Sequence, residues 1–189
     1  MEQQKHFFFA VKIPDPIKIL MKESMESLKA KFPFKRWVHH EDLHITLAFL
    51  GFAPADKLAL AMQNLNGGLK GVKSLSLEFD EIGIFGNPRS PRIFWANTKE
   101  SKELGIIRDK VYEACIKAGF KLETRPFKPH ITLARKWNEE ETFQPEMLEV
   151  WKNLRPVPSI FSSDEVVLYQ THLEKTPKYE VKEVFRLDH

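Results

Sequence analysis

The chain has 189 residues and a mass of 22.1 kDa, with 42% hydrophobic and 29% charged residues. This composition excludes intrinsic disorder and is ordinary for a folded globular protein. The formal net charge of +3 is compatible with a phosphate-bearing partner but does not by itself indicate one. The one cysteine, Cys115, excludes an intramolecular disulfide and a zinc ribbon.

The apolar run Phe7–Val11 is too short for a signal peptide, and no later run reaches membrane-spanning length. We therefore expect a cytoplasmic protein that does not bind a membrane, and we expect it to be a monomer. No linker or low-complexity stretch divides the chain, so we expect residues 1–189 to form a single domain.

Hydrophobic periodicity predicts alternating groups of strands and helices along the chain. We expect helices near residues 17–31, 54–65, 101–118 and 145–154. Asp15 is placed to cap the first helix, and Gly67-Gly68 to end the second. We expect strands at residues 6–13, 36–39, 43–50, 74–84, 92–98, 127–135, 164–171 and 179–187. Paired strands between helices indicate an α+β fold with antiparallel sheets and argue against a doubly wound sheet.

One short pattern occurs twice, as Leu-His-Ile-Thr-Leu at residues 43–47 and Pro-His-Ile-Thr-Leu at residues 129–133. Side chains alternate along a strand, so His44 shares a face with Thr46, and His130 shares one with Thr132. The apolar residues between them can anchor each strand in the core. Two such strands packed around one groove would bring two imidazoles and two hydroxyls to one ligand.

Two histidines without a metal cluster are typical of general acid–base catalysis near neutral pH. Threonine hydroxyls can donate hydrogen bonds to phosphoryl oxygens. In-line displacement at phosphorus needs a base for the nucleophile and an acid for the leaving oxygen. The pattern therefore favours catalysis over the alternative, two hydrogen-bonded histidines on strand surfaces.

The sequence resembles the two-histidine (2H) phosphoesterases, whose hallmark is two His-x-Thr-x motifs. Within that superfamily it is similar to the RNA 2′,3′-cyclic phosphodiesterases of bacteria and archaea, also described as 2′–5′ RNA ligases. The resemblance spans residues 6–187. Three stretches carry it: RWVHHEDLHITLAFLG (36–51), IGIFGNPRSPRIFW (82–95) and RPFKPHITLAR (125–135).

The resemblance implies two pseudo-symmetric lobes, each an antiparallel sheet backed by helices, with a central active-site cleft. It also implies metal-independent hydrolysis of an RNA-terminal 2′,3′-cyclic phosphate to a 2′-phosphate, with minor reverse 2′–5′ ligation and no cofactor. The expected partner is RNA with such an end, or a nucleoside 2′,3′-cyclic phosphate. His44 would be the proton donor and His130 the proton acceptor; sequence alone does not distinguish the two assignments.

Further candidates surround the motifs. Thr46 and Thr132 would bind the substrate phosphate, and Arg135 and Arg92 are further candidates for binding it. In a regular strand Arg135 would point away from His130, and a bulge would be needed to bring it back. Phe127 is the candidate for stacking on a base. A metal site formed by His39, His40 and His44 is disfavoured, since no carboxylates lie at ligand spacing.

Two alternatives remain open. The first is a binding module for RNA ends or nucleotides that uses the same cleft without turnover. The second is a 2H phosphodiesterase that acts on 2′–5′ oligonucleotides or on a small cyclic phosphate. The sequence does not indicate the natural RNA or a base preference.

Overall fold

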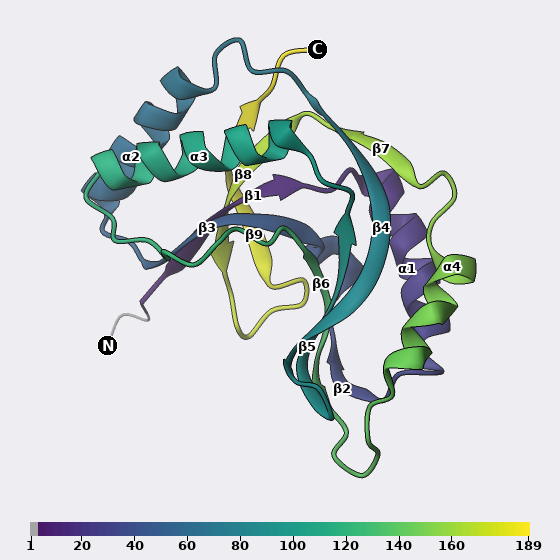
Figure 1. Cartoon of the computed structure of the whole chain (residues 1–189). Helices are drawn as coiled ribbons and strands as arrows, with labels where there is room; N and C mark the ends of the chain where they lie inside the picture. Colours follow the sequence, from purple (N-terminus) through teal and green to yellow (C-terminus); the bar gives the residue numbers. More distant parts are fainter. Residues whose placement is uncertain (1–3) are drawn as a thin grey trace.

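The structure is a computed structural model that describes residues 4–189. Two antiparallel sheets lie between two layers of helices (Figure 1). The four-stranded sheet has the order β3-β1-β8-β9, and the five-stranded sheet has the order β2-β6-β5-β4-β7. This arrangement confirms the predicted α+β class and its two lobes. The strands are β1 (His6–Lys12), β2 (Phe34–Trp37), β3 (His44–Phe52), β4 (Leu75–Asn87), β5 (Ser90–Thr98), β6 (Ile131–Trp137), β7 (Ile160–Ser163), β8 (Glu165–Thr171) and β9 (Tyr179–Arg186).

The helices cover one face of each sheet. Helices α2 (Ala55–Gly68) and α3 (Lys102–Lys117) pack against each other beside the four-stranded sheet, and α1 (Asp15–Lys29) and α4 (Trp151–Leu154) lie beside the five-stranded one (Figure 1). Two 3₁₀ turns, η1 (His40–Asp42) and η2 (Pro145–Val150), complete the elements. Among the described residues, no helix is long and apolar enough to cross a membrane.

One hydrophobic core extends beneath both sheets. Phe9, Val11 and Ile45 enter it from the four-stranded sheet, while Phe79 and Phe94 enter it from the five-stranded one. All of these side chains are almost fully buried. Burying this apolar area is the main favourable term in folding. The shared core explains why the two sheets hold a fixed relation to each other.

Several element boundaries differ from those predicted. Pro14, rather than Asp15, stands at the N-cap of α1, because Asp15 already has helical geometry and makes no side-chain cap bond. Helix α2 continues through Gly67 and Gly68 instead of ending before them. Strand β6 begins at Ile131, so residues 127–130 precede the strand and have no regular secondary structure. Ser101 caps α3 by accepting from the amide of Leu104, at the predicted start.

Candidate active site on the open faces of the two sheets

The two motif strands, β3 and β6, come from different sheets and contact each other. Their burial alternates in the same way: residues 44–49 and residues 130–135 each run half-buried, buried, half-buried, buried, buried, exposed. The isoleucine and leucine of each motif lie in the core, whereas the histidine and threonine lie on the face that the helices leave open. The predicted division of each motif into a core side and an open side is confirmed.

Both motif strands contain a β-bulge at the same place. Phe9 pairs with Ala48 and Ala10 with Thr46, so Leu47 is an extra residue in β3. In β6, Phe94 pairs with Ala134 and Trp95 with Thr132, so Leu133 is extra. An extra residue reverses the alternation of every side chain beyond it. The residue five positions after each histidine therefore returns to the open face.

Arg135 is the residue that the bulge in β6 brings back to the open face. It pairs with Ile93, and Thr132 pairs with Trp95, two residues along the same strand. Directly paired residues in an antiparallel sheet project from one face, so Arg135 and Thr132 share the open face. The bulge that Arg135 needs in order to share this face is therefore present in β6, at Leu133. The corresponding residue of β3 is Phe49, whose side chain is 59% exposed.

The two histidines are held in the same way. The Nδ1–H of His44 donates to the carbonyl oxygen of Asp42 at 2.6 Å, and that of His130 donates to the carbonyl oxygen of Lys128 at 2.7 Å. A carbonyl only accepts, so each Nδ1 carries a proton and each Nε2 is the nitrogen left for chemistry. The Nε2 of His44 lies 3.0 Å from the hydroxyl oxygen of Thr46.

His44 lies in an aromatic pocket formed by Phe8, Tyr169 and Tyr179, with ring centroids 4.8 to 5.9 Å from its own. Burial removes water that would stabilise the imidazolium, and this lowers the pKa of His44 from 6.5 to about 4. The nearby positive charges of Lys18, His130 and Arg135 lower it further. The effects of His130 and Arg135 on this pKa agree with the contact between β3 and β6, which brings the two motifs close together.

His130 is in a similar but less extreme environment. Desolvation lowers its pKa below the ordinary value of 6.5, and the charge of Arg135 acts in the same direction. The ring of Phe85 meets it edge-on with a centroid distance of 5.0 Å. Both histidines are therefore neutral at pH 7 in the free protein, and a bound anion would favour protonation of either one.

Asp42, which the sequence analysis did not identify as a site residue, holds His44 through its own backbone carbonyl. Its buried carboxylate accepts hydrogen bonds from the backbone amides of Lys178 and Tyr179 at 2.9 to 3.1 Å. The ammonium group of Lys18, in α1, donates to the neighbouring carbonyl of Glu41 at 2.7 Å. These bonds tie the short turn before β3 to α1 and to β9. No local pattern signals them, because the partners lie far away in sequence.

Acid stability offers a check on the environment of His44. Its pKa is lower in the folded chain than in the unfolded one, so the unfolded state binds more protons between pH 6.5 and 4. The contribution of His44 to the free energy of unfolding is therefore fully present above pH 6.5 and is lost as the pH drops toward 4. The full loss is roughly 3 kcal/mol. Urea unfolding across this range should show a shallower pH dependence in His44→Gln than in wild type. His189→Gln, at the exposed C-terminus, is the control, and equal pH slopes in all three proteins would contradict the account.

The remaining predicted site residues, Arg92 and Phe127, make no hydrogen bond or aromatic contact with the two histidines among the described residues. Arg92 is exposed and lies at a bulge in β5. Its side chain packs so closely on Gly86 that a Cβ atom at that position would be only 3.2 Å away from it. Phe127 is half-buried against the core, 5.6 Å from the guanidinium of Arg108. Their roles toward a ligand stay predictions. His39 and His40 contact each other, and no group of three or more metal-ligating side chains gathers among residues 4–189.

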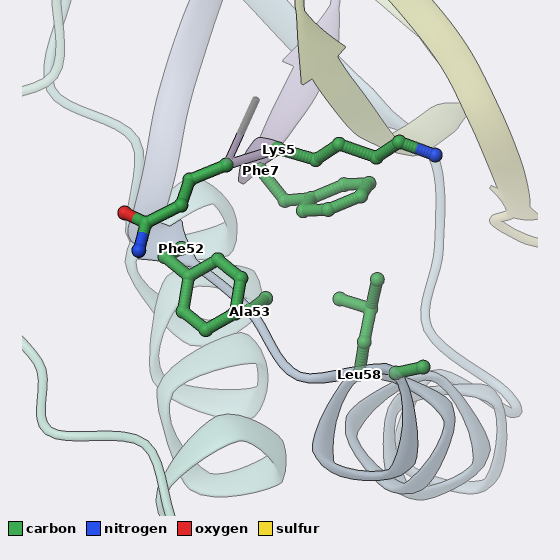
Figure 2. Close-up of a pocket in the computed structure, with 7 residues that line it drawn as sticks. Lys5, Phe7, Phe52, Ala53 and Leu58 are labelled. Atoms are coloured by element: carbon green, nitrogen blue, oxygen red, sulfur yellow. The ribbon is translucent and has the colours of Figure 1, made fainter. Parts of the chain in front are cut away.

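A cavity of about 650 Å³ lies elsewhere, between the start of β1 and helix α2. Figure 2 shows Lys5, Phe7, Phe52, Ala53 and Leu58 around it. His6 pairs with Phe52, whereas Lys12 pairs with His44, so this cavity and His44 lie at opposite ends of the same two strands. It is not part of the candidate active site.

The fold, with one histidine–threonine pair from each of two sheets, defines a class of protein, and comparison with known families agrees. The chain belongs to the 2′-5′ RNA ligase superfamily, whose model matches residues 15–175. The chain is 43% identical over 185 residues to a Geobacillus stearothermophilus protein called RNA 2′,3′-cyclic phosphodiesterase. That match covers 98% of this chain but only 58% of the relative, so the chain spans about three-fifths of that protein's length.

A second relative has nearly the same length as this chain. It is the RNA 2′,3′-cyclic phosphodiesterase of Bacillus subtilis, 35% identical over 192 residues, with 96% of this chain and 94% of the relative covered. Solved structures of similar fold include E. coli LigT in apo form, with a TM-score of 0.76, 24% identity and 98% of both chains covered. Another is TT0787 of Thermus thermophilus, with a TM-score of 0.76, 20% identity and coverage of 96% and 97%.

Proposed function

We propose that this chain is an RNA 2′,3′-cyclic phosphodiesterase that hydrolyses a terminal cyclic phosphate to a 2′-phosphate. The observation that carries the proposal is the pair of histidines, each fixed at Nδ1 by a backbone carbonyl so that Nε2 is left for the substrate. The names of the Geobacillus and Bacillus relatives support the same substrate class. Because each sheet supplies one histidine, the proposal also treats residues 1–189 as one functional domain.

In the proposed reaction, a water molecule attacks phosphorus while the Nε2 of His130 accepts its proton. The bond from phosphorus to the 3′ oxygen breaks, and the Nε2–H of His44 donates a proton to that oxygen. The 2′ ester bond stays, so the product is a 2′-phosphate with a free 3′ hydroxyl. The hydroxyls of Thr46 and Thr132 hold the non-bridging oxygens, and Arg135 supplies positive charge on the same open face.

The assignment requires His44 to be protonated in the complex, although its pKa is about 4 in the free protein. A bound phosphodiester anion supplies the missing favourable charge and raises that pKa. The Thr46 hydroxyl, 3.0 Å from Nε2, then accepts from the imidazolium until the leaving oxygen takes its place. Reversing every step would join a 2′,3′-cyclic phosphate to a 5′-hydroxyl and form a 2′–5′ linkage, and we propose this as a minor activity.

The histidine pair predicts bell-shaped pH profiles. The acidic limb belongs to the base, which must be neutral, and the alkaline limb to the acid, which must be protonated. Both pKa values lie below 6.5 in the free protein, so we expect kcat/KM to peak below pH 6.5. We expect kcat to peak at a higher pH, because the bound anion raises the pKa of the acid. Steady-state rates from pH 4 to 9 give both profiles, and flat profiles between pH 5 and 9 would contradict the mechanism.

Phosphorus NMR tests the proposal directly. Purified protein in EDTA is mixed with a nucleoside 2′,3′-cyclic phosphate, and in a second tube with a short RNA that ends in the same group. The expected result is the signal of a 2′-monophosphate in both tubes. A 3′-phosphate product would overturn the regiochemistry. No conversion of either substrate would overturn the activity and favour a non-catalytic binding module.

A further inference from the structure

A second arginine lies beside Arg135 on the open face of the five-stranded sheet. Arg36, in β2, pairs directly with Arg135 in β6, so the two side chains project from the same face. Trp37, the next residue, pairs with Ala134 and packs on the opposite side, against Phe34 and Phe94. The ammonium group of Lys29 in α1 also lies over Trp37, which confirms that the helix side is the other one. Arg36 therefore points away from the core.

Neither arginine forms an ion pair within the part of the chain that the structure describes. Within residues 4–189, the arginines that make ion pairs are Arg108, Arg125 and Arg186. Both Arg36 and Arg135 are exposed. Like charges directly opposite each other across two strands destabilise a sheet. An anion that binds both side chains would offset this repulsion.

The position of the pair relative to the histidines indicates which anion this is. The charge of Arg135 lowers the pKa of His44, His130 and Tyr179, so Arg135 borders the reacting centre. Arg36 contributes to none of these shifts and lies one strand farther out, on β2, which is the edge of its sheet. The positive charge therefore extends from Arg135, beside the reacting centre, to Arg36 on the edge strand.

We propose that Arg36, together with Arg135, binds the phosphodiester on the 5′ side of the terminal nucleotide, so that the chain acts on oligoribonucleotide ends in preference to free nucleoside cyclic phosphates. This inference rests on the proposed function and extends it from the reacting phosphate to the next one. A nucleoside 2′,3′-cyclic phosphate lacks that second phosphate and cannot use Arg36. An RNA strand leaves the site over the edge strand, where no further strand blocks its path.

The test compares two substrates in two variants. kcat/KM is measured with a nucleoside 2′,3′-cyclic phosphate and with a trinucleotide that ends in the same group, for wild type, Arg36→Gln and Lys35→Gln. Lys35 is the matched control, because it is an exposed cation next to Arg36 on the same strand but is not the residue that pairs with Arg135. The ratio of RNA to nucleoside kcat/KM should fall about tenfold or more in Arg36→Gln, the size expected from losing a hydrogen bond between charged groups. An unchanged ratio would overturn the proposal.

A binding measurement separates this proposal from the proposed function. The probe is a fluorescein-labelled RNA hexamer that ends in a 2′-phosphate, followed by anisotropy from 50 to 300 mM salt. Arg36→Gln should bind more weakly, with a salt slope smaller by about 0.7, the value for one phosphate contact on a single strand. Equal slopes in wild type and variant would overturn the subsite even if the enzyme is active. Unequal slopes with no turnover in wild type would support the subsite while the proposed hydrolysis fails.

Thermal unfolding guards against a purely structural role for Arg36. Removing one of two facing cations relieves their repulsion, so the melting temperature of Arg36→Gln should be equal to or higher than that of wild type. A clearly lower melting temperature would contradict the proposal, because it would mean that Arg36 is retained for stability.

Discussion

Replacement of His130 by alanine, or of His44 by alanine, should lower kcat by roughly 10²- to 10⁴-fold, the usual contribution of one general acid or base. The reason lies in the geometry of the site. Each ring is fixed by one hydrogen bond from Nδ1–H to a backbone carbonyl, which holds Nε2 in place for proton transfer, and alanine has no such group. Single-turnover rates on an RNA 2′,3′-cyclic phosphate measure the loss.

The residual pH profiles of the same two variants distinguish the roles. Without the base, the acidic limb should disappear, and without the acid, the alkaline limb should disappear. We expect His130→Ala to lose the acidic limb and His44→Ala to lose the alkaline limb. The opposite result would exchange donor and acceptor, and near-normal rates in either variant would contradict the mechanism. His6→Ala, an exposed histidine at the far end of the same sheet, is the matched control.

The second large effect concerns Asp42. In Asp42→Ala, the backbone amides of Lys178 and Tyr179 lose their acceptor, and the turn that holds His44 loses its tie to β9. Loss of a buried, charge-assisted hydrogen-bond network costs about 2–5 kcal/mol. We expect the free energy of unfolding to fall by that amount in urea titrations. Asp80→Ala, an exposed aspartate on β4, should change it by less than about 0.5 kcal/mol.

Asp42 acts on the reaction through His44, which makes it a positioning residue. Asp42→Asn keeps the shape and one acceptor oxygen, so the chain should stay folded at 25 °C with a smaller loss of stability than Asp42→Ala. Because Tyr179 packs edge-on against His44, a shift of β9 would also change the surroundings of the imidazole. We expect kcat of Asp42→Asn to fall by about tenfold and the alkaline limb to move. An unchanged pH profile would mean that Asp42 serves stability alone.

The sequence predicted most of the secondary structure and the division of each motif between core and open face. Strand alternation was sufficient for His44, Thr46 and Thr132, and also for His130, which directly precedes β6, because the first three residues of each motif come before the bulges. Alternation alone did not place Arg135, because the position of the bulge at Leu133 cannot be located from the residue types. Phe49 and Arg135 occupy corresponding positions, and only the registers of the two sheets make this visible.

Other features depend on contacts between distant segments. Strand β7 is four residues long and pairs with the start of β4, and the prediction assigned no strand there because its hydrophobic signal is too brief. Helix α2 passes through Gly67-Gly68, where the local preference for ending a helix is overridden and Leu69 still closes the last turn. Asp42 and Arg36 gain their positions from β9 and β6, so single-strand reasoning could not identify them.

The most direct test of the central claim is a double-variant cycle at the two histidines. If His44 and His130 act as one acid–base pair, the double variant His44→Ala/His130→Ala should be little slower than the slower single variant, because groups that work as a unit are strongly non-additive. Hydrolysis of an RNA 2′,3′-cyclic phosphate in EDTA is the assay, with circular dichroism to verify folding. Rate losses that multiply, so that the double variant loses the product of both single effects, would contradict a shared catalytic step.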